Sequence, residues 1–271
     1  MQLTIRHLTT YRYSREIPYE IEMLRLTPRS YEGLVVANWS VCGDRNRPLP
    51  SFIDGLGNVV HTNAINRPHD SATIAVVGTV ETRATGGLVS DARECLPPGY
   101  FLRATPLSAA DETIAAFARE GARGARSRDR LMALMGAVAE RIVYRSGATH
   151  AATSAAEALA LGEGVCQDHA HVFIAACRSL GVPARYVGGY FWPGQNWAGD
   201  QASHAWAEAF VEDTGWIGFD PANRTAQDDR HVRVSLGLDY ASAAPIRGIR
   251  RGHAEETLAV TCDVAAMQSQ Q

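Results

Sequence analysis

Apolar and polar positions alternate along the first hundred residues in short runs. Examples are 3–9, 34–37 and 73–80, where apolar side chains recur at every second position or fill a brief continuous run. A period of two is typical of β-strands, and Gly, Pro and Asn interrupt these runs as turns do. The glycines and asparagine of 54–58, between two apolar runs, predict a hairpin turn. We therefore expect an antiparallel β-sandwich of about seven strands over residues 1–104.

The apolar spacing changes to a helical one beyond residues 103–107. We expect Ser108 and Ser127 to cap the first two helices, because apolar residues follow each serine at intervals of three and four. A third helix is predicted over 153–161, and a fourth begins at Cys166 and ends before the Gly-Val-Pro sequence of 181–183. The second half of the chain is therefore expected to start with a group of helices.

Strand patterns return after the fourth helix. We expect strands over 185–191, 204–211 and 216–220, and a last strand over 258–264 whose alternating apolar residues suit the edge of a sheet. Together these patterns predict an α+β protein, with the sandwich followed by a separate core of helices and sheet over residues 105–271.

Composition narrows the classes of function. The chain has 271 residues, of which 46% are apolar, so it can fill a substantial core. Its 26 basic and 29 acidic residues give a net charge of -3, which provides no electrostatic footprint for nucleic acid or for an anionic membrane surface. Every basic residue of the 26 is arginine, which excludes Schiff-base catalysis by a lysine of this chain.

The cysteines indicate a reducing environment. There are five, at 42, 95, 166, 177 and 262, with no CxxC pair among them, so they do not form a disulfide framework. The amino terminus lacks the pattern of a signal peptide, and no run approaches the roughly 18 apolar residues of a membrane span. We expect a cytoplasmic protein with no membrane partner, and the sequence leaves its oligomeric state open.

Cys166 stands where a glycine-containing loop turns into a helix. Backbone N–H groups and the positive end of the helix dipole favour a thiolate there, and the same N–H groups could receive an oxyanion. Gly164 allows a tight entry and leaves room above the sulfur. Taken alone, this cysteine could equally be a small packing residue, as we expect the other four cysteines to be.

Two downstream residues favour the interpretation of Cys166 as a nucleophile. His204 and Trp206 share one face of a predicted strand, and Asp220 ends the next strand. Adjacent antiparallel strands can bring the carboxylate beside the imidazole, and the imidazole can then take a proton from the thiol of Cys166. Taken alone, His204 is more typical of a structural strand histidine, and Asp220 of a turn residue before proline. The order of cysteine, histidine and aspartate along the chain is what indicates a Cys-His-Asp site.

His169 and His171 raise the question of a metal. Residues two apart on a helix point to different sides, and no nearby carboxylate or cysteine completes a ligand set. We therefore expect no metal and no cofactor, and we expect Asp168 to interact with the helix dipole.

At these residues the sequence resembles the bacterial transglutaminase-like and cysteine protease family, whose core belongs to the papain-like superfamily. The segments that carry the resemblance are 164–170, 180–187, 189–190, 204–206 and 220–223 in the core, and 24–29 and 54–58 in the amino-terminal half. The tail departs from the family's pattern, with Leu238 where an arginine is expected and Ser242 where an acid is expected. The resemblance implies a papain-like transglutaminase core behind a β-rich domain, and a triad carried by Cys166, His204 and Asp220.

The expected activity is thiol-dependent acyl transfer on a peptide, a protein or a small amide through a thioester. Hydrolysis is favoured because water is always present, while transfer to an amine shares the same acyl-enzyme. A non-enzymatic binding scaffold on the same fold is the alternative of another class. Tyr144 and Trp206 are candidates for a second oxyanion donor by position, although both are more typical of packing.

Overall fold

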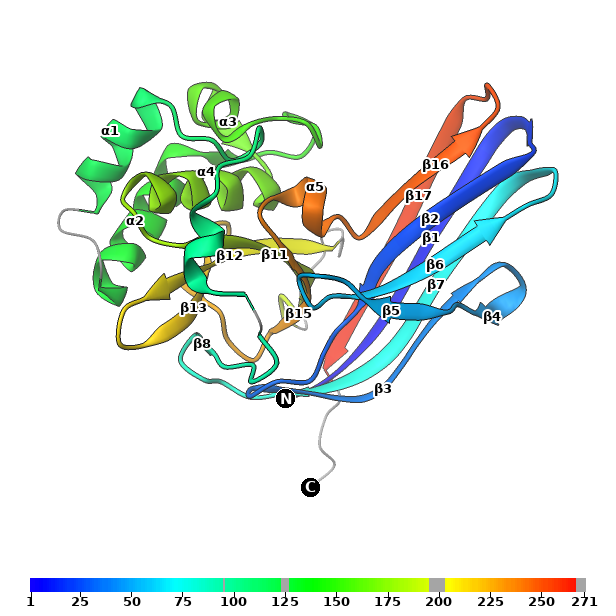
Figure 1. Ribbon diagram of the computed structural model, residues 1–271, viewed down its shortest axis with the longest axis horizontal. Helices are drawn as coiled ribbons and strands as arrows, with labels where there is room; N and C mark the ends of the chain where they lie inside the picture. Colours follow the sequence, from blue (N-terminus) through cyan, green and yellow to red (C-terminus); the bar gives the residue numbers. More distant parts are fainter. Residues whose placement is uncertain (95, 123–126, 195–202, 267–271) are drawn as a thin grey trace.

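The computed structural model describes residues 1–94, 96–122, 127–194 and 203–266, and Cys95 lies outside these residues. An elongated pair of β-sheets stands beside a core in which helices cover a further sheet (Figure 1). The expected α+β class, with a strand-rich amino-terminal sandwich and a transglutaminase-like core, is confirmed.

Two antiparallel sheets form the sandwich. The strand order of the larger sheet is β17 (Glu256–Ala266), β1 (Gln2–Ile17), β7 (His69–Thr82), β3 (Leu34–Gly43) and β4 (Arg47–Pro48). The order of the smaller sheet is β16 (Ile246–Arg251), β2 (Tyr19–Thr27), β6 (Val59–Ile65) and β5 (Ser51–Ile53). Leu24 and Leu26 of β2 pack against Val41, Ile74 and Val76 of the facing sheet, as the alternating pattern requires. The hairpin expected at 54–58 joins β5 to β6, and a 3-10 turn, η1 (Asp44–Asn46), joins β3 to β4.

The tail of the chain returns to the sandwich. The expected last strand is β17, and it lies at a sheet edge, where it pairs with β1 from Leu3↔Ala266 to Tyr13↔Glu256. β16 pairs with β2 in the other sheet. In space, therefore, residues 246–266 complete the sandwich, whereas the sequence boundary grouped them with the core. An alternating pattern specifies a strand but does not specify its partner, because the pairing joins residues that are far apart in the chain.

The core contains a third antiparallel sheet with the order β14 (Thr225–Ala226), β13 (Gly215–Asp220), β12 (His204–Val211), β11 (Ala184–Phe191) and β15 (His231–Gly237). The three expected strands are β11, β12 and β13. β15 was not expected, although His231 to Leu236 alternates polar and apolar residues and thus carried the signal. β8 (Leu88–Val89) also pairs with β13, and a short parallel pair joins β9 (Val143–Tyr144) to β10 (Glu163–Gly164).

Five helices accompany this sheet in the described residues. They are α1 (Glu112–Gly121), α2 (Arg128–Arg141), α3 (Ala155–Leu161), α4 (Cys166–Ser179) and α5 (Tyr240–Ala243), with a 3-10 helix η2 (Pro98–Leu102) before α1. The cap expected at Ser108 is wrong: Asp111 caps α1 by accepting a hydrogen bond from the Ile114 N–H at 2.8 Å. Ser108 is buried and instead accepts a hydrogen bond from Arg178. Ser127 does precede α2, without a side-chain capping bond.

Helix α4 lies on the small-residue face of β12. Ala205, Ala207 and Ala209 are all buried against it, and short side chains let the helix axis approach the sheet closely. On the other side, Val232 and Val234 of β15 pack with Leu3 and Ile5 of β1. The core sheet is therefore covered by helices on one face and contacts the sandwich on the other.

Candidate active site

Cys166 begins α4, as the sequence predicted. Gly162 ends α3 in the left-handed region at φ +73°, which lets the chain reverse, and the parallel pairing of Gly164 with Tyr144 fixes the entry strand. The N–H groups of Cys166 and Gln167 precede the first hydrogen bond of α4, which runs from the Asp168 N–H to the Val165 carbonyl oxygen at 3.0 Å, so they have no acceptor within the helix. The Cys166 side chain is partly accessible, which a nucleophile requires.

Gly164 makes room for a carboxylate. A Cβ atom at this position would lie 2.6 Å from Asp168 Oδ2, so the expected space above the sulfur is in fact the space that Asp168 occupies. Asp168 Oδ2 accepts hydrogen bonds from the Val165 N–H at 2.8 Å and from the Thr149 hydroxyl at 2.6 Å. The carboxylate thus caps the first turn of α4 and holds the loop that presents Cys166.

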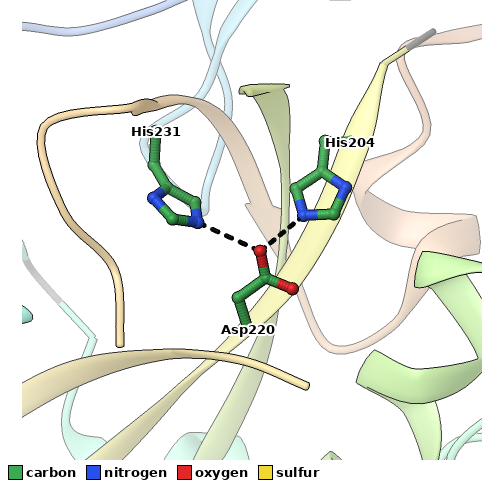
Figure 2. A group of neighbouring side chains, drawn as sticks. All are labelled: His204, Asp220 and His231. Atoms are coloured by element: carbon green, nitrogen blue, oxygen red, sulfur yellow. Dashed lines mark hydrogen bonds and ion pairs between the residues drawn. The ribbon is translucent and has the colours of Figure 1, made fainter. Parts of the chain in front are cut away.

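His204 and Asp220 meet across adjacent strands. The register of β12 and β13 pairs Ala207 with Phe219, which brings His204 Nε2 to 2.7 Å from Asp220 Oδ2 (Figure 2). Burial alone would lower the pKa of His204, but the charge of Asp220, its hydrogen bond and a hydrogen bond to Cys166 raise that pKa to about 10. Burial likewise opposes ionisation of Asp220, yet His204 and His231 hold the pKa of that carboxyl well below its usual range.

His204 therefore contacts both of its expected partners. Since Nε2 is engaged by Asp220, Nδ1 is the nitrogen left for the Cys166 side chain. The three residues that the sequence singled out thus lie together, one from the start of α4, one from the start of β12 and one from the end of β13.

Two further residues contact Asp220, and neither was predicted from the sequence. His231 Nε2 lies 3.1 Å from Asp220 Oδ2 (Figure 2), and its Nδ1 lies 2.9 Å from Asp228 Oδ1. Asn223 donates from Nδ2 to Asp220 Oδ2 at 2.7 Å. Asp220 is fully buried, so these donors compensate a carboxylate that has lost its water. The signal for His231 was its place in the overlooked strand β15, and Asn223 stood within the segment 220–223.

Aromatic rings enclose the imidazole of His204. Trp206 stacks on it with a centroid distance of 6.0 Å and an interplanar angle of 25°, and Phe191 lies at 5.2 Å. The indole N–H of Trp206 donates to Gln227 Oε1 at 3.0 Å. That donor is thus engaged away from Cys166, and Trp206 supports the His204 ring from one side.

Tyr144 lies near the thiol on the short strand β9. Burial of the hydroxyl, together with the charges of Cys166 and Asp220, raises its pKa to about 12, so the group keeps its proton and can donate. Its side chain is more than half exposed at 57%. Tyr144 lies on the strand that pairs with Gly164 but is not among the residues that line the cavity at Cys166.

His169 and His171 do not form a site with each other. The ring nitrogens of His169 lie 2.9 Å from the Val165 carbonyl oxygen and 3.0 Å from the Ile142 carbonyl oxygen. His171 accepts a hydrogen bond from the Tyr240 N–H, and burial lowers its pKa to about 4. Both histidines are buried and hold backbone segments to α4.

The atoms of His204, Asp220 and His231 could also surround a metal ion, since one ligand atom of each lies within 4.8 Å of the others. All three already interact through hydrogen bonds centred on Asp220 Oδ2. A metal ion would displace these bonds and take the His204 nitrogen that faces Asp220.

Cys166 and His204 open into a cavity of about 210 Å³. Its walls include Tyr186 and Gly189 of β11, Tyr240 of α5, and Arg25 of the sandwich strand β2. The site therefore lies where the core meets the amino-terminal sheets.

Known protein families match the sandwich part and the core part of the chain separately. Residues 115–221 match the model of the transglutaminase-like superfamily, and residues 3–81 match that of the bacterial transglutaminase-like N-terminal region. A putative cysteine protease from Cytophaga hutchinsonii has a similar structure, with a TM-score of 0.78 at 22% identity over 100% of this chain and 92% of the other. This likeness concerns the fold.

Two relatives show how far the sequence similarity extends. An uncharacterized protein of Mycobacterium tuberculosis is 31% identical over 97% of this chain and 92% of its own length. A protein-glutamine gamma-glutamyltransferase of Pseudomonas aeruginosa is 33% identical over 86 residues, which are 30% of this chain and 12% of that protein. No helix among the described residues is long and apolar enough to span a membrane. With both halves matched in order and the core fold in place, the chain belongs to the bacterial transglutaminase-like family.

Proposed function

We propose that this protein is a thiol enzyme that transfers the acyl group of an amide to water, with Cys166 as nucleophile, His204 as general base and acid, and Asp220 as the residue that orients the imidazole. The observation that carries the proposal is that His204 interacts with the Cys166 side chain and with Asp220 at once. The raised pKa of His204 favours an imidazolium beside the Cys166 sulfur, ready to give a proton to a leaving amine.

The reaction follows from this geometry in two halves. The Cys166 sulfur attacks the carbonyl carbon of the amide, and the first-turn N–H groups of α4 stabilise the oxyanion. His204 then gives its proton to the leaving amine, so the C–N bond breaks and a thioester remains. In the second half His204 takes a proton from water, the hydroxide attacks the thioester, and the C–S bond breaks to release an acid and the thiolate.

An amine could replace water in the second half. The similarity to a protein-glutamine gamma-glutamyltransferase over 86 residues supports this second candidate. We favour hydrolysis because water needs no dedicated binding site. We further propose a peptide, protein or small amide as substrate, and a reducing compartment such as the cytoplasm, in keeping with the four free cysteines of the described residues.

The test compares the wild type with Cys166→Ala and His204→Ala, using p-nitrophenyl acetate as acyl donor. We expect a rapid release of nitrophenol and an acetylated Cys166 in the wild type, because the thiolate attacks the ester. Intact-protein mass spectrometry then follows the loss of the acetyl group with and without glycine amide. Decay that is independent of the amine supports hydrolysis, and decay accelerated by the amine supports transfer.

Cys177→Ala is the matched control, because Cys177 lies on the same helix but is fully buried, with burial raising the pKa of its thiol. It should acetylate like the wild type. Acetylation of Cys166 no faster than that of the remaining thiols would overturn the enzymatic proposal and favour a binding scaffold.

A further inference from the structure

The cavity at Cys166 has one wall that the proposed mechanism does not use. Arg25 and Leu26 of β2 line it from the sandwich, opposite residues of the core such as Tyr186 and Tyr240. Both belong to the segment 24–29, which resembles the family's amino-terminal domain. A charged residue of the other half of the protein thus lines the space where a substrate of Cys166 would lie.

The guanidinium of Arg25 is buried and only partly paired. Its side chain is 11% exposed, and Nε donates to Asp54 Oδ2 at 3.2 Å. The buried Nη1 atom has no hydrogen-bond partner among the described residues. A guanidinium presents five N–H donors in a fixed plane, so the bond to Asp54 leaves most of them for another acceptor.

Asp54 is itself saturated by other donors. Its Oδ1 accepts from the N–H groups of Leu56 and Asn58, and its Oδ2 accepts from the Asn58 side chain besides Arg25. These bonds anchor Asp54 in the 54–58 turn. Asp54 therefore holds the guanidinium in place through Nε and accepts no hydrogen bond from the buried Nη1.

The backbone around Arg25 is also fixed. β2 lies between β16 and β6, and the Arg25 N–H donates to the Pro245 carbonyl oxygen at 2.8 Å. Pro245 lines the same cavity. Because strand and side chain are both held, little conformational entropy remains to be lost when a ligand binds.

The charges of the cavity favour an anion. Its described lining contains no aspartate or glutamate, and its only arginine is Arg25. The positive charge of the His204 imidazolium is compensated by Asp220, which lies outside the lining. A carboxylate is the common biological group that accepts paired N–H bonds from a guanidinium, and a partly buried site strengthens this interaction.

We propose that Arg25 is a specificity residue that binds a carboxylate of the substrate, so that the enzyme selects amides bearing a carboxylate close to the bond attacked by Cys166. This inference rests on the proposed acyl transfer and assigns a role to the sandwich, which supplies the residue. The carboxylate can come from an acidic side chain or from the carboxyl terminus of a peptide, and both sources present the same chemistry to Arg25.

The test measures how peptides protect Cys166 from alkylation by iodoacetamide, followed by mass spectrometry. One pair is acetyl-Ala-Glu-Ala-amide and acetyl-Ala-Gln-Ala-amide, and the other is acetyl-Ala-Ala-Ala with a free or an amidated carboxyl terminus. We expect the acidic member of one pair to protect at a concentration about 10- to 100-fold lower than its neutral counterpart, as for a hydrogen bond to a charged group. The pair that differs identifies the source of the carboxylate.

Arg25→Gln should abolish this preference, and Arg25→Lys should retain part of it because the charge remains. Arg29→Gln is the matched control: Arg29 lies in the same segment and donates to the Gly57 carbonyl oxygen, but it does not line the cavity. It should keep the wild-type preference. Thermal unfolding of each variant establishes that it is folded.

Equal protection by both members of each pair, absence of protection by any peptide, or an unchanged preference in Arg25→Gln would overturn the role of Arg25. Failure of the proposed acyl transfer would give a different result. If Cys166 is not a nucleophile, Cys166 of the wild type will be alkylated no faster than the other thiols, whatever peptide is present.

Discussion

The carboxylate of Asp220 controls the electrostatics of the candidate site at the residue scale. It is fully buried, and one of its oxygens lies within hydrogen-bonding distance of His204, His231 and Asn223. A buried charge with this many donors fixes their positions as well as its own. Changes to Asp220 should therefore alter both the tautomer of His204 and its affinity for a proton.

Asp220→Asn should lower the pKa of His204 from about 10, because the carboxylate charge that raises it is removed. We expect acylation of Cys166 to slow by about 100- to 10,000-fold, the range of general acid–base contributions. NMR titration of the His204 ring and the rate of nitrophenol release measure the two effects. An unchanged pKa of His204 in this variant would contradict the assigned cause.

The same pKa predicts how stability depends on pH. A histidine whose folded-state pKa lies above its unfolded value of 6.5 stabilises the fold fully below that value and loses this contribution as the pH rises through about 10. The midpoint temperature of thermal unfolding of the wild type should thus decrease as the pH is raised from about 6.5 to about 10. In His204→Ala the fall should be smaller, and an equal fall in both proteins would count against the assignment.

His231 is expected to act through Asp220. His231→Leu removes a donor at 3.1 Å from the carboxylate and should reduce kcat by about 10- to 100-fold with little change in KM. His231→Gln can still donate and should recover part of the loss. Steady-state kinetics separate the two parameters, and a change confined to KM would indicate contact with the substrate instead.

At the scale of elements, the start of α4 determines where the thiol lies. Cys166 is placed by the turn at Gly162, by the pairing of β10 with β9, and by the cap that Asp168 provides. The alanine face of β12 then lets the helix lie close to the sheet that carries His204. The sequence indicated this helix start correctly, because caps and glycines act within a few residues.

Gly164→Ala should disturb this helix start. The new Cβ would lie 2.6 Å from Asp168 Oδ2, so the carboxylate must leave the Val165 N–H. We expect a loss of about 1–3 kcal/mol in the free energy of unfolding and slower alkylation of Cys166. Denaturant titration and alkylation rates measure the two effects.

Gly136→Ala is the matched control for this change. It lies inside α2, and a Cβ there would contact nothing within 4 Å. It should stabilise the protein by about 0.5–1 kcal/mol, since alanine favours helix. Equal effects of the two substitutions would refute the steric reason given for Gly164.

For the whole molecule, the sandwich and the core depend on each other. The tail strands β16 and β17 lie in the sandwich sheets, β8 lies beside β13, and Arg25 of the sandwich lines the cavity at Cys166. Asn58 of the 54–58 turn bonds both the N–H and the carbonyl of Leu236, at 2.8 and 2.9 Å. Contacts of this kind connect the turn of the sandwich to the strand next to the site.

Asn58→Ala should weaken this connection. It leaves two buried backbone groups of Leu236 without partners, and we expect it to lower the free energy of unfolding by about 2–4 kcal/mol. Asn58→Asp keeps the acceptor for the Leu236 N–H but places a carboxylate against the Leu236 carbonyl and the Asp54 carboxylate, so it should cost at least as much. Denaturant titration of both variants measures the difference, and equal stability of Asn58→Ala and the wild type would contradict the role of this contact.

The sequence by itself determined what depends on nearby residues. The alternation of the first hundred residues, the helix that starts at Cys166, the strands of His204 and Asp220, and the family resemblance were all present in local patterns. The cap of α1 was misplaced by three residues, since Ser108 and Asp111 are both acceptable caps and burial beside Arg178 decided between them.

Only the tertiary structure decided which distant residues meet. The pairing of the tail with β1 and β2, the contacts of His231 and Asn223 with Asp220, and the position of Arg25 in the cavity join residues far apart in the chain. Such contacts follow from the packing of sheets on each other and on helices, which no local periodicity encodes. The chemical groups of the proposed reaction could thus be found in the sequence, while their supporting residues and the wall that faces them required the fold.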